Sequence, residues 1–208
     1  MVMTATFQRF AAICAFLAAL GAILYAILFI AIVEGAGKTT YEWWFFLLMA
    51  GGAATIPVFA ALYVRLAAID AGMALTAFAL ALLAALGGIM HGSYNLGRLV
   101  TPRAESIPAG FEEISHGVLR YAVAGLALLL IGWLLSRDPG LPDLLAWLAY
   151  LGGAVLVFIY LGRLFDFITP GDYVSLLPPI VYGFVIHPLL YAWLGLIFWR
   201  RAAPAVAP

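Results

Sequence analysis

The chain has 208 residues, of which 66% are hydrophobic and 10% are charged, and its formal net charge is zero. A soluble domain has about 25% charged residues, so this composition excludes an ordinary soluble domain and indicates a protein that crosses the lipid bilayer several times. The balanced charge gives no basis for nucleic-acid binding, which requires a basic surface. The single cysteine, Cys14, excludes an intramolecular disulfide and a cysteine-based metal site.

Six apolar runs follow one another along the chain, and each is long enough to cross a bilayer as a helix. The first run is too long for the core of a signal peptide, which spans about 7–15 residues. We therefore predict an all-α, polytopic membrane helix bundle, with residues 1–208 forming one domain of six transmembrane helices. The predicted helices span about residues 7–33, 43–66, 71–100, 108–136, 141–168 and 174–200.

Small residues recur inside these runs. They include Cys14, Ala18, Ala22 and Ala26 in the first run and the glycine pairs at 51–52, 87–88 and 152–153. Small residues at helical spacing let helices approach closely in lipid, so we interpret these positions as helix-packing sites. The prolines inside the second and sixth runs, Pro57 and Pro188, predict kinks in those helices.

The positions of the arginine and lysine residues predict the orientation, because basic residues accumulate on the cytoplasmic side. A cytoplasmic amino terminus places five arginines inside and three basic residues outside. The inner set is Arg9, Arg65, Arg137, Arg200 and Arg201, and the outer set is Lys38, Arg98 and Arg103. We therefore expect a multi-pass protein of the cell inner or plasma membrane, with both termini in the cytoplasm.

The fourth and fifth runs have a recognisable layout in the segment HGVLRYAVAGLALLLIGWLLSRDPGLPDLLAWLAYLGGAVLVFIYLGRLFD. A histidine near the helix start precedes a leucine-rich run with a G-x-L-L-x-[RK] ending. A Leu-Pro turn, a helix with a central glycine and a late aspartate follow. Together with the opening QRFAAICAFLAALGAILYAI, this layout resembles the bacterial integral membrane family called domain of unknown function 4386. The resemblance covers most of the chain and implies the fold, and that family has no established activity to carry over.

Residues 87–120 contain two of the three histidines, three of the nine arginines and three of the five glutamates, and Arg163 and Asp166 lie near the end of the fifth run. Residues spaced by three, four or seven positions share one helical face, and charges inside lipid need partners or water. Alternating crossings bring these residues to one side of the membrane, so we predict a single polar cluster at the outer ends of three helices. Its members are His91, Asn95 and Arg98 on the third helix, Glu113, His116 and Arg120 on the fourth, and Arg163 and Asp166 on the fifth.

Within this cluster we expect Arg120 to pair with Glu113 or Asp166, and Arg163 to pair with Asp166 or Glu112. Two interpretations are open. The cluster is either a binding or catalytic pocket that faces the outer side, or a network of ion pairs that fixes the helix ends. A charged group inside a membrane is by default a hypothesis of function.

A third histidine, His187, is a secondary candidate because it lies deep in the sixth helix. Lone buried histidines usually have only a structural hydrogen bond, and Tyr182 or Tyr191 would provide one here. We predict no metal and no cofactor. Zinc needs three or four ligands and no motif of the HExxH type is present, and His91 and His116 differ too much in depth to ligate a haem together.

Two functions follow from these patterns. The first is a non-enzymatic membrane protein, either an accessory or assembly subunit or a binder of a small molecule. The second is an intramembrane enzyme or a small transporter that uses the polar cluster. The small-residue stripes favour the first function, and the clustered histidine, glutamate and arginine residues favour the second. Expected partners are the lipid bilayer and a membrane-protein partner or a second copy of the chain.

Overall fold

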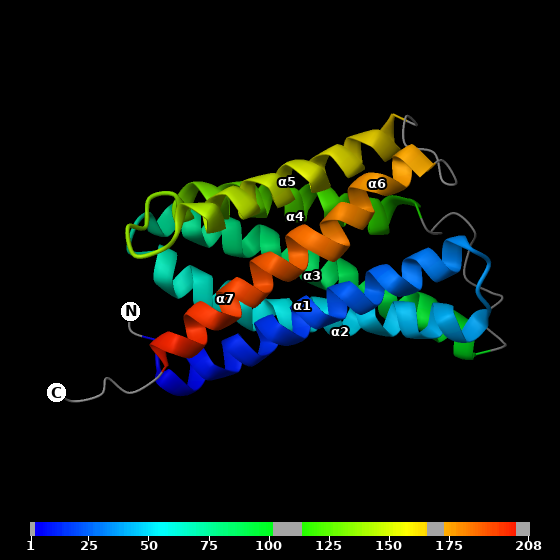
Figure 1. Ribbon diagram of the computed structural model, residues 1–208, viewed down its shortest axis with the longest axis horizontal. Helices are drawn as coiled ribbons and strands as arrows, with labels where there is room; N and C mark the ends of the chain where they lie inside the picture. The colour runs from blue at the N-terminus through cyan, green and yellow to red at the C-terminus, as the bar shows by residue number, and fades with distance from the viewer. Residues whose placement is uncertain (1–2, 102–113, 166–172, 203–208) are drawn as a thin grey trace.

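The computed structural model describes residues 3–101, 114–165 and 173–202, and in these ranges the chain is all-α (Figure 1). The elements are α1 (Ala5–Val33), α2 (Lys38–Leu66), α3 (Ala71–Val100), α4 (Ile114–Leu135), α5 (Asp143–Leu164), α6 (Tyr173–Val181), the π-helix η2 (Tyr182–Ile186) and α7 (His187–Arg201). The last three elements follow one another directly and form one helical crossing.

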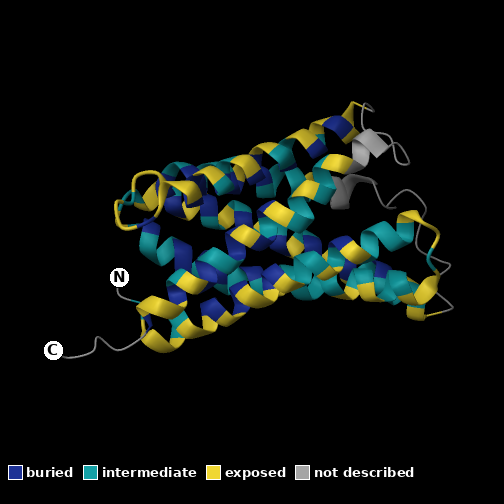
Figure 2. Cartoon of the chain, in the orientation of Figure 1, coloured by how far each residue is buried: buried dark blue, intermediate teal, exposed yellow. Residues whose placement is uncertain are grey.

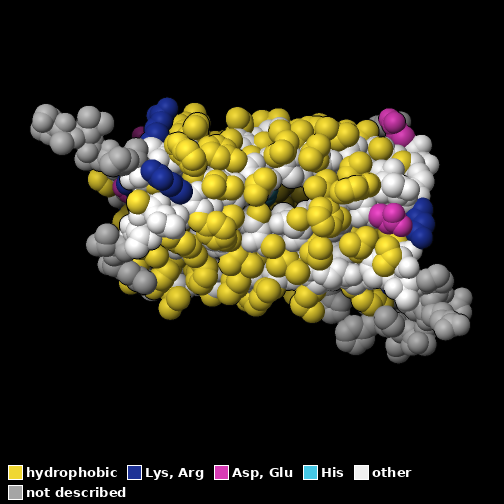
Figure 3. All heavy atoms as spheres, turned by 90° about the horizontal axis from the view of Figure 1, so that it is seen from below, with side chains coloured by type: hydrophobic (Ala, Val, Ile, Leu, Met, Phe, Trp, Pro, Cys, Tyr) yellow, Lys and Arg dark blue, Asp and Glu magenta, His cyan; other side chains and the backbone are white. Residues whose placement is uncertain are grey.

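Five helical segments of the described chain are long and apolar enough to cross a membrane, and Leu119–Leu135 of α4 is a shorter apolar helix. Many large apolar side chains on these segments point outward, among them Leu17, Leu83 and Trp147, which are more than half exposed. Figure 3 shows this apolar surface, with charged side chains confined to its two ends. Helix length, hydropathy and this outward apolar surface identify a multi-pass membrane protein.

The helices form a closed ring. Each of α1 to α5 packs against the next helix along the chain, and α7 packs against α1 to close the ring. The contacts of α5 with α6, η2 and α7 are sparser than the other neighbour contacts. The start of α1 and the end of α7 lie at the same end of the bundle (Figure 1).

The end of the bundle that holds these two termini is fastened by polar contacts. Arg65 at the end of α2 pairs with Asp138 in the turn between α4 and α5, at 2.6 Å. In the same turn, the carbonyl oxygen of Gly140 accepts a hydrogen bond from Arg201 of α7 at 3.0 Å. Asp70 accepts from the backbone N–H of Met73 at 2.9 Å and so caps the start of α3. The contacts of Arg65 and Arg201 join helices that are far apart in the sequence.

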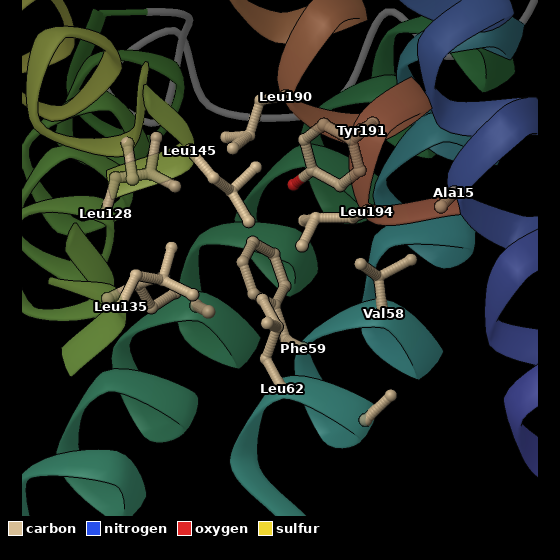
Figure 4. Close-up of a cluster of buried hydrophobic side chains, with 14 of the residues drawn as sticks. Ala15, Val58, Phe59, Leu62, Leu128, Leu135, Leu145, Leu190, Tyr191 and Leu194 are labelled. Carbon is tan, nitrogen blue, oxygen red and sulfur yellow. The ribbon is translucent and has the colours of Figure 1, made fainter. Parts of the chain in front are cut away.

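A dense apolar core fills the half of the bundle next to this end, which we call the packed half (Figures 2 and 4). Large side chains from four helices are almost completely buried there. They include Leu62, Leu66, Leu134, Leu135, Leu145, Leu194 and Phe198. Alanines of α1, such as Ala11 and Ala15, lie opposite them and leave room for them. Large and small side chains therefore interdigitate in the packed half.

Glycines permit the closest helix contacts, as the small-residue pattern predicted. A Cβ atom on Gly153 of α5 would lie 2.7 Å from the carbonyl oxygen of Gly125 of α4. A Cβ atom on Gly52 of α2 would lie 2.9 Å from the carbonyl oxygen of Ala85 of α3. Side chains do not fit at such distances, so these positions are confirmed as helix-packing sites. The pair at 87–88 differs, because it faces the side chain of Arg120.

Several helix boundaries differ from the predicted ones. The second helix begins at Lys38 and not at 43, because its polar first turn is helical and contains a Lys38–Glu42 ion pair at 3.6 Å. The fifth begins at Asp143, because Pro142 is extended and precedes the first turn, and it ends at Leu164 and not at 168. Residues 108–113 and 166–168 of the predicted helices lie outside the described residues.

Candidate functional site

The half of the bundle opposite the packed half surrounds a central cavity of about 300 Å³, to which every crossing contributes side chains. Its wall contains many glycine and alanine residues besides large aromatic and aliphatic ones. The small residues include Gly21 and Ala22 of α1, Gly51 of α2, Ala84 of α3 and Ala124 of α4. These side chains are too short to reach across the ring of helices, so the space between them stays unfilled. We call this part of the bundle the hollow half.

The central cavity is partly open to its surroundings. Figure 3 shows a hollow in the middle of the apolar surface on the face that includes α1, well away from the charged ends. Two cavity-lining glycines, Gly21 and Gly51, have nothing within 4 Å of the position that a Cβ atom would take. An opening at this height of a membrane protein faces lipid chains and not water.

A single guanidinium group dominates the polar part of the cavity. Arg120 of α4 donates a hydrogen bond from Nη2 to the hydroxyl of Tyr121 at 3.0 Å, and Tyr25 of α1 lies within hydrogen-bonding reach of the same group. Gly88 of α3 borders the guanidinium, and a Cβ atom there would lie 3.5 Å from Nη1, an ordinary contact distance. The Nε donor of Arg120 is buried and has no hydrogen-bond partner among the described residues.

A second arginine, Arg163 near the end of α5, lines the same cavity. The ion pairs among the described residues are Lys38–Glu42 and Arg65–Asp138, and neither of them involves the two cavity arginines. In this part of the chain, tyrosine hydroxyls and not carboxylates face the guanidinium of Arg120. The polar part of the cavity is therefore rich in positive charge and in hydrogen-bond donors.

The structure brings three members of the predicted polar cluster to this cavity, namely His91, Arg120 and Arg163. Asn95 is buried, but its side-chain amide donates to the carbonyl oxygen of His91 one turn earlier, at 2.9 Å. Arg98 is exposed and does not line the cavity. Asn95 and Arg98 thus share the face of α3 with His91 without joining the site.

The remaining cluster members cannot be placed. Glu113 and Asp166 lie outside the described residues, as does Glu112. His116 lies in α4, but its side chain is not among those described. The predicted ion pairs of Arg120 and Arg163 with these carboxylates stay predictions.

The deeper part of the cavity contains His187, where the last crossing changes from a π-helix to an α-helix. Its ring stacks on Tyr191 at a centroid distance of 4.3 Å and meets the edge of Tyr182 at 5.5 Å. Its Nδ1 atom is buried, and no described residue forms a hydrogen bond with it. Ring contacts with these two tyrosines are found where we expected a hydrogen bond.

The π-helix was not predicted, although Pro188 gives a reason for it. Proline has no N–H group, so the hydrogen-bond pattern is already broken at this position. The N–H of His187 bonds to the carbonyl of Tyr182, five residues earlier. Such wide turns are rare and occur frequently at functional sites. Here the wide turn contributes Tyr182, Gly183 and His187 to the cavity wall.

Sequence analysis missed three aromatic polar side chains of the cavity, namely Tyr25, Trp44 and Tyr121, and named Tyr182 and Tyr191 only as partners of His187. Their signal was present, because a tyrosine in the middle of an apolar run needs a polar partner for its hydroxyl. Trp44 stacks on Tyr25 at a centroid distance of 5.0 Å, and its buried Nε1 has no hydrogen-bond partner in the described part of the chain.

The described residues contain no group of three or more histidine, cysteine, aspartate or glutamate side chains placed to hold a metal ion. The polar groups that do converge are a guanidinium, tyrosine hydroxyls and imidazoles. The guanidinium only donates hydrogen bonds, whereas tyrosine hydroxyls and neutral imidazoles both donate and accept them, so the site has donors for a molecule that carries acceptors.

Fold and site define a multi-pass helical membrane protein whose helices surround a cavity within the apolar part of the bundle. Comparison of the chain with protein-family models, with curated proteins and with solved structures finds no match. The resemblance to the family called domain of unknown function 4386 therefore stays a prediction.

Proposed function

We propose that the protein is a membrane-embedded binding protein that holds one small, largely apolar molecule in the central cavity. The cavity itself carries this proposal. Ligand sites are concave, mostly apolar, about 300–1,000 Å³ in volume and equipped with a few polar groups that orient the ligand. The central cavity has each of these properties, with a volume of about 300 Å³ and Arg120, His91 and His187 in its wall.

The position of the opening supports entry of the ligand from the lipid bilayer. The hollow lies in the apolar surface between the charged ends (Figure 3). On the side of the two termini, the buried core of the packed half closes the cavity. Access from lipid with one end closed favours a binding protein over a continuous pathway across the membrane.

We further propose six crossings of the cell inner membrane with both termini in the cytoplasm. The arginine-rich end, which holds Arg65 and Arg201, is then the cytoplasmic end. The test places a cysteine at Lys38 in a chain that carries Cys14→Ala. A membrane-impermeant reagent should label that cysteine from outside intact cells. Labelling only after the cells are opened would reverse the proposed orientation.

Binding is tested with decanol, a neutral ten-carbon probe, and purified protein in lipid nanodiscs. We expect saturable binding of one decanol per protein, above the partitioning into empty nanodiscs. Ala22→Leu, which adds bulk to the cavity wall, should weaken binding at least fivefold. Ala53→Leu is the matched control, because Ala53 is exposed on the outside of α2. Absence of saturable binding, or equal binding to all three proteins, would refute the proposed function.

A further inference from the structure

We propose that the bound molecule is an amphiphile with a single carboxylate headgroup, and that Arg120 holds this headgroup inside the central cavity. The inference rests on the proposed function and specifies its ligand. It follows from three observations on the hollow half: positive charge without a carboxylate partner among the described residues, an arrangement of donors that fits a carboxylate, and an apolar space of matching size.

The charge of Arg120 is the first observation. A guanidinium keeps its charge under all physiological conditions, and a charge inside a membrane protein needs a partner. Across the described residues, Arg120 has the Tyr121 hydroxyl as its bonded partner and Tyr25 within reach, and these hydroxyls are neutral groups. Arg163 adds a second positive charge to the cavity wall. An anionic ligand would supply the negative charge that these contacts lack.

The donor arrangement is the second observation. The planar guanidinium presents N–H groups in a fixed fork that matches the two oxygens of a carboxylate. Among the described residues the Nε donor of Arg120 has no hydrogen-bond partner, and the hydroxyls of Tyr121 and Tyr25 lie beside the group. Gly88 borders the guanidinium on the side of Nη1. A carboxylate oxygen would accept a hydrogen bond from the Nε donor of Arg120.

The size of the apolar space is the third observation. Arg120 and Leu128 line the cavity from the same helix, and they lie about 12 Å apart along its axis. The cavity volume of about 300 Å³ lies at the lower end of the range for sites that hold small ligands. A medium-length hydrocarbon chain with its carboxylate at Arg120 therefore fits between the headgroup site and the packed half.

The test compares probes that share a ten-carbon chain: decanoate, decanol and decyl phosphate. Wild-type protein in nanodiscs of uncharged lipid should bind decanoate about tenfold more tightly than decanol, the gain expected for a charge-assisted hydrogen bond. Arg120→Gln should remove this preference while decanol binding persists, which shows that the variant is folded. Lys38→Gln removes one positive charge at the start of α2, outside the cavity, and this variant should keep the preference for decanoate.

The outcomes separate this inference from the proposed function. Equal binding of decanoate and decanol by the wild type would overturn the carboxylate inference and leave the binding function standing. Tighter binding of decyl phosphate than of decanoate would assign a phosphate headgroup instead and would also overturn it. If none of the three probes binds saturably, the proposed function itself fails. The comparison of the three probes with the wild type decides the class of headgroup even if Arg120→Gln does not fold.

Discussion

The packed half and the hollow half are built from the same helices, yet one is filled and the other is not. In the packed half, the alanines of α1 lie opposite large side chains such as Leu194 and Phe198. In the hollow half, Gly21 and Ala22 continue the same stripe. The cavity that they line is also bordered by other small residues, such as Ala84. A small residue therefore produces close packing or a cavity according to the size of the residue on the opposite helix.

The two halves also treat charge differently. The arginine at the packed end, Arg65, has a carboxylate partner in Asp138 at 2.6 Å. Among the described residues, the arginine of the hollow half, Arg120, has tyrosine hydroxyls instead. A paired charge fastens helices together, and the packed half therefore maintains the fold. The hollow half contains the cavity to which we assign the proposed binding function.

The largest effect should come from adding a side chain where helices touch. Gly153→Val places a Cβ atom 2.7 Å from the backbone of α4, which cannot move aside without separating the two helices. We expect a loss of unfolding free energy of about 3 kcal/mol, measured by reversible unfolding in mixed micelles. Gly51→Ala is the control, because its Cβ atom meets open space. It should leave stability unchanged or raise it by up to about 1 kcal/mol through helix propensity. Equal losses in both variants would contradict the comparison.

Removing a large side chain should distinguish the two halves less strongly. Leu62 is 2% exposed in the packed half, and Leu62→Ala should cost about 2 kcal/mol. This value lies at the low end for buried leucines because lipid is also apolar. Leu48 already borders the cavity, and Leu48→Ala should cost less than about 1 kcal/mol because fewer contacts are lost. A larger loss for Leu48→Ala in the same unfolding assay would show that the cavity wall is as tightly packed as the core.

Ion pairs provide a third comparison. The side chains of Arg65 and Asp138 are 13% and 14% exposed, and a double-mutant cycle with alanine should give a coupling energy of about 1–2 kcal/mol. The Lys38–Glu42 pair at the other end is 63% and 30% exposed. Its coupling should not exceed about 0.5 kcal/mol. Comparable coupling energies for the two pairs would show that the packed end is not fastened by charge.

The smallest effect concerns the headgroup site. Gly88→Ala places a Cβ atom 3.5 Å from Nη1 of Arg120, which is ordinary contact. We expect stability to change by less than about 1 kcal/mol, because the gain in helix propensity offsets slight crowding. Gly92→Ala is the matched contrast on α3, since its Cβ atom would lie 2.7 Å from the carbonyl oxygen of Phe45. Melting temperatures in detergent that fall equally in both variants would place Gly88 among the helix-packing sites.

Much of the fold could be predicted from the sequence because apolar runs of sufficient length have few alternatives in lipid. The all-α class and most helix boundaries follow from that constraint alone. The polar first turn of α2 was mistaken for a loop because Lys38 and Glu42 suggest solvent, and a helix can extend beyond the lipid. The π-helix before Pro188 was missed because the proline predicts a disturbance without specifying its form.

The site was predictable only in part, for a different physical reason. His91, Arg120 and Arg163 stood out because charge and imidazole are rare in an apolar chain. The cavity itself could not be predicted, since Ala22 and Gly51 indicate close packing unless the opposing residues are known. Tyr25 and Tyr121 were overlooked because tyrosine is common at membrane surfaces, and only the fold shows that these two face inward.

The closure of the ring by α7 on α1 has a consequence for biosynthesis. Proteins fold as they are made, from the amino terminus onward, so α1 to α5 enter the membrane before their closing partner exists. Until the ribosome has delivered the last crossing, the inner wall of the ring faces lipid and Arg120 lacks an enclosed environment. The central cavity is therefore complete only after the last crossing has inserted. A nascent chain that stops before α7 would expose this surface to chaperones and quality-control proteases of the membrane.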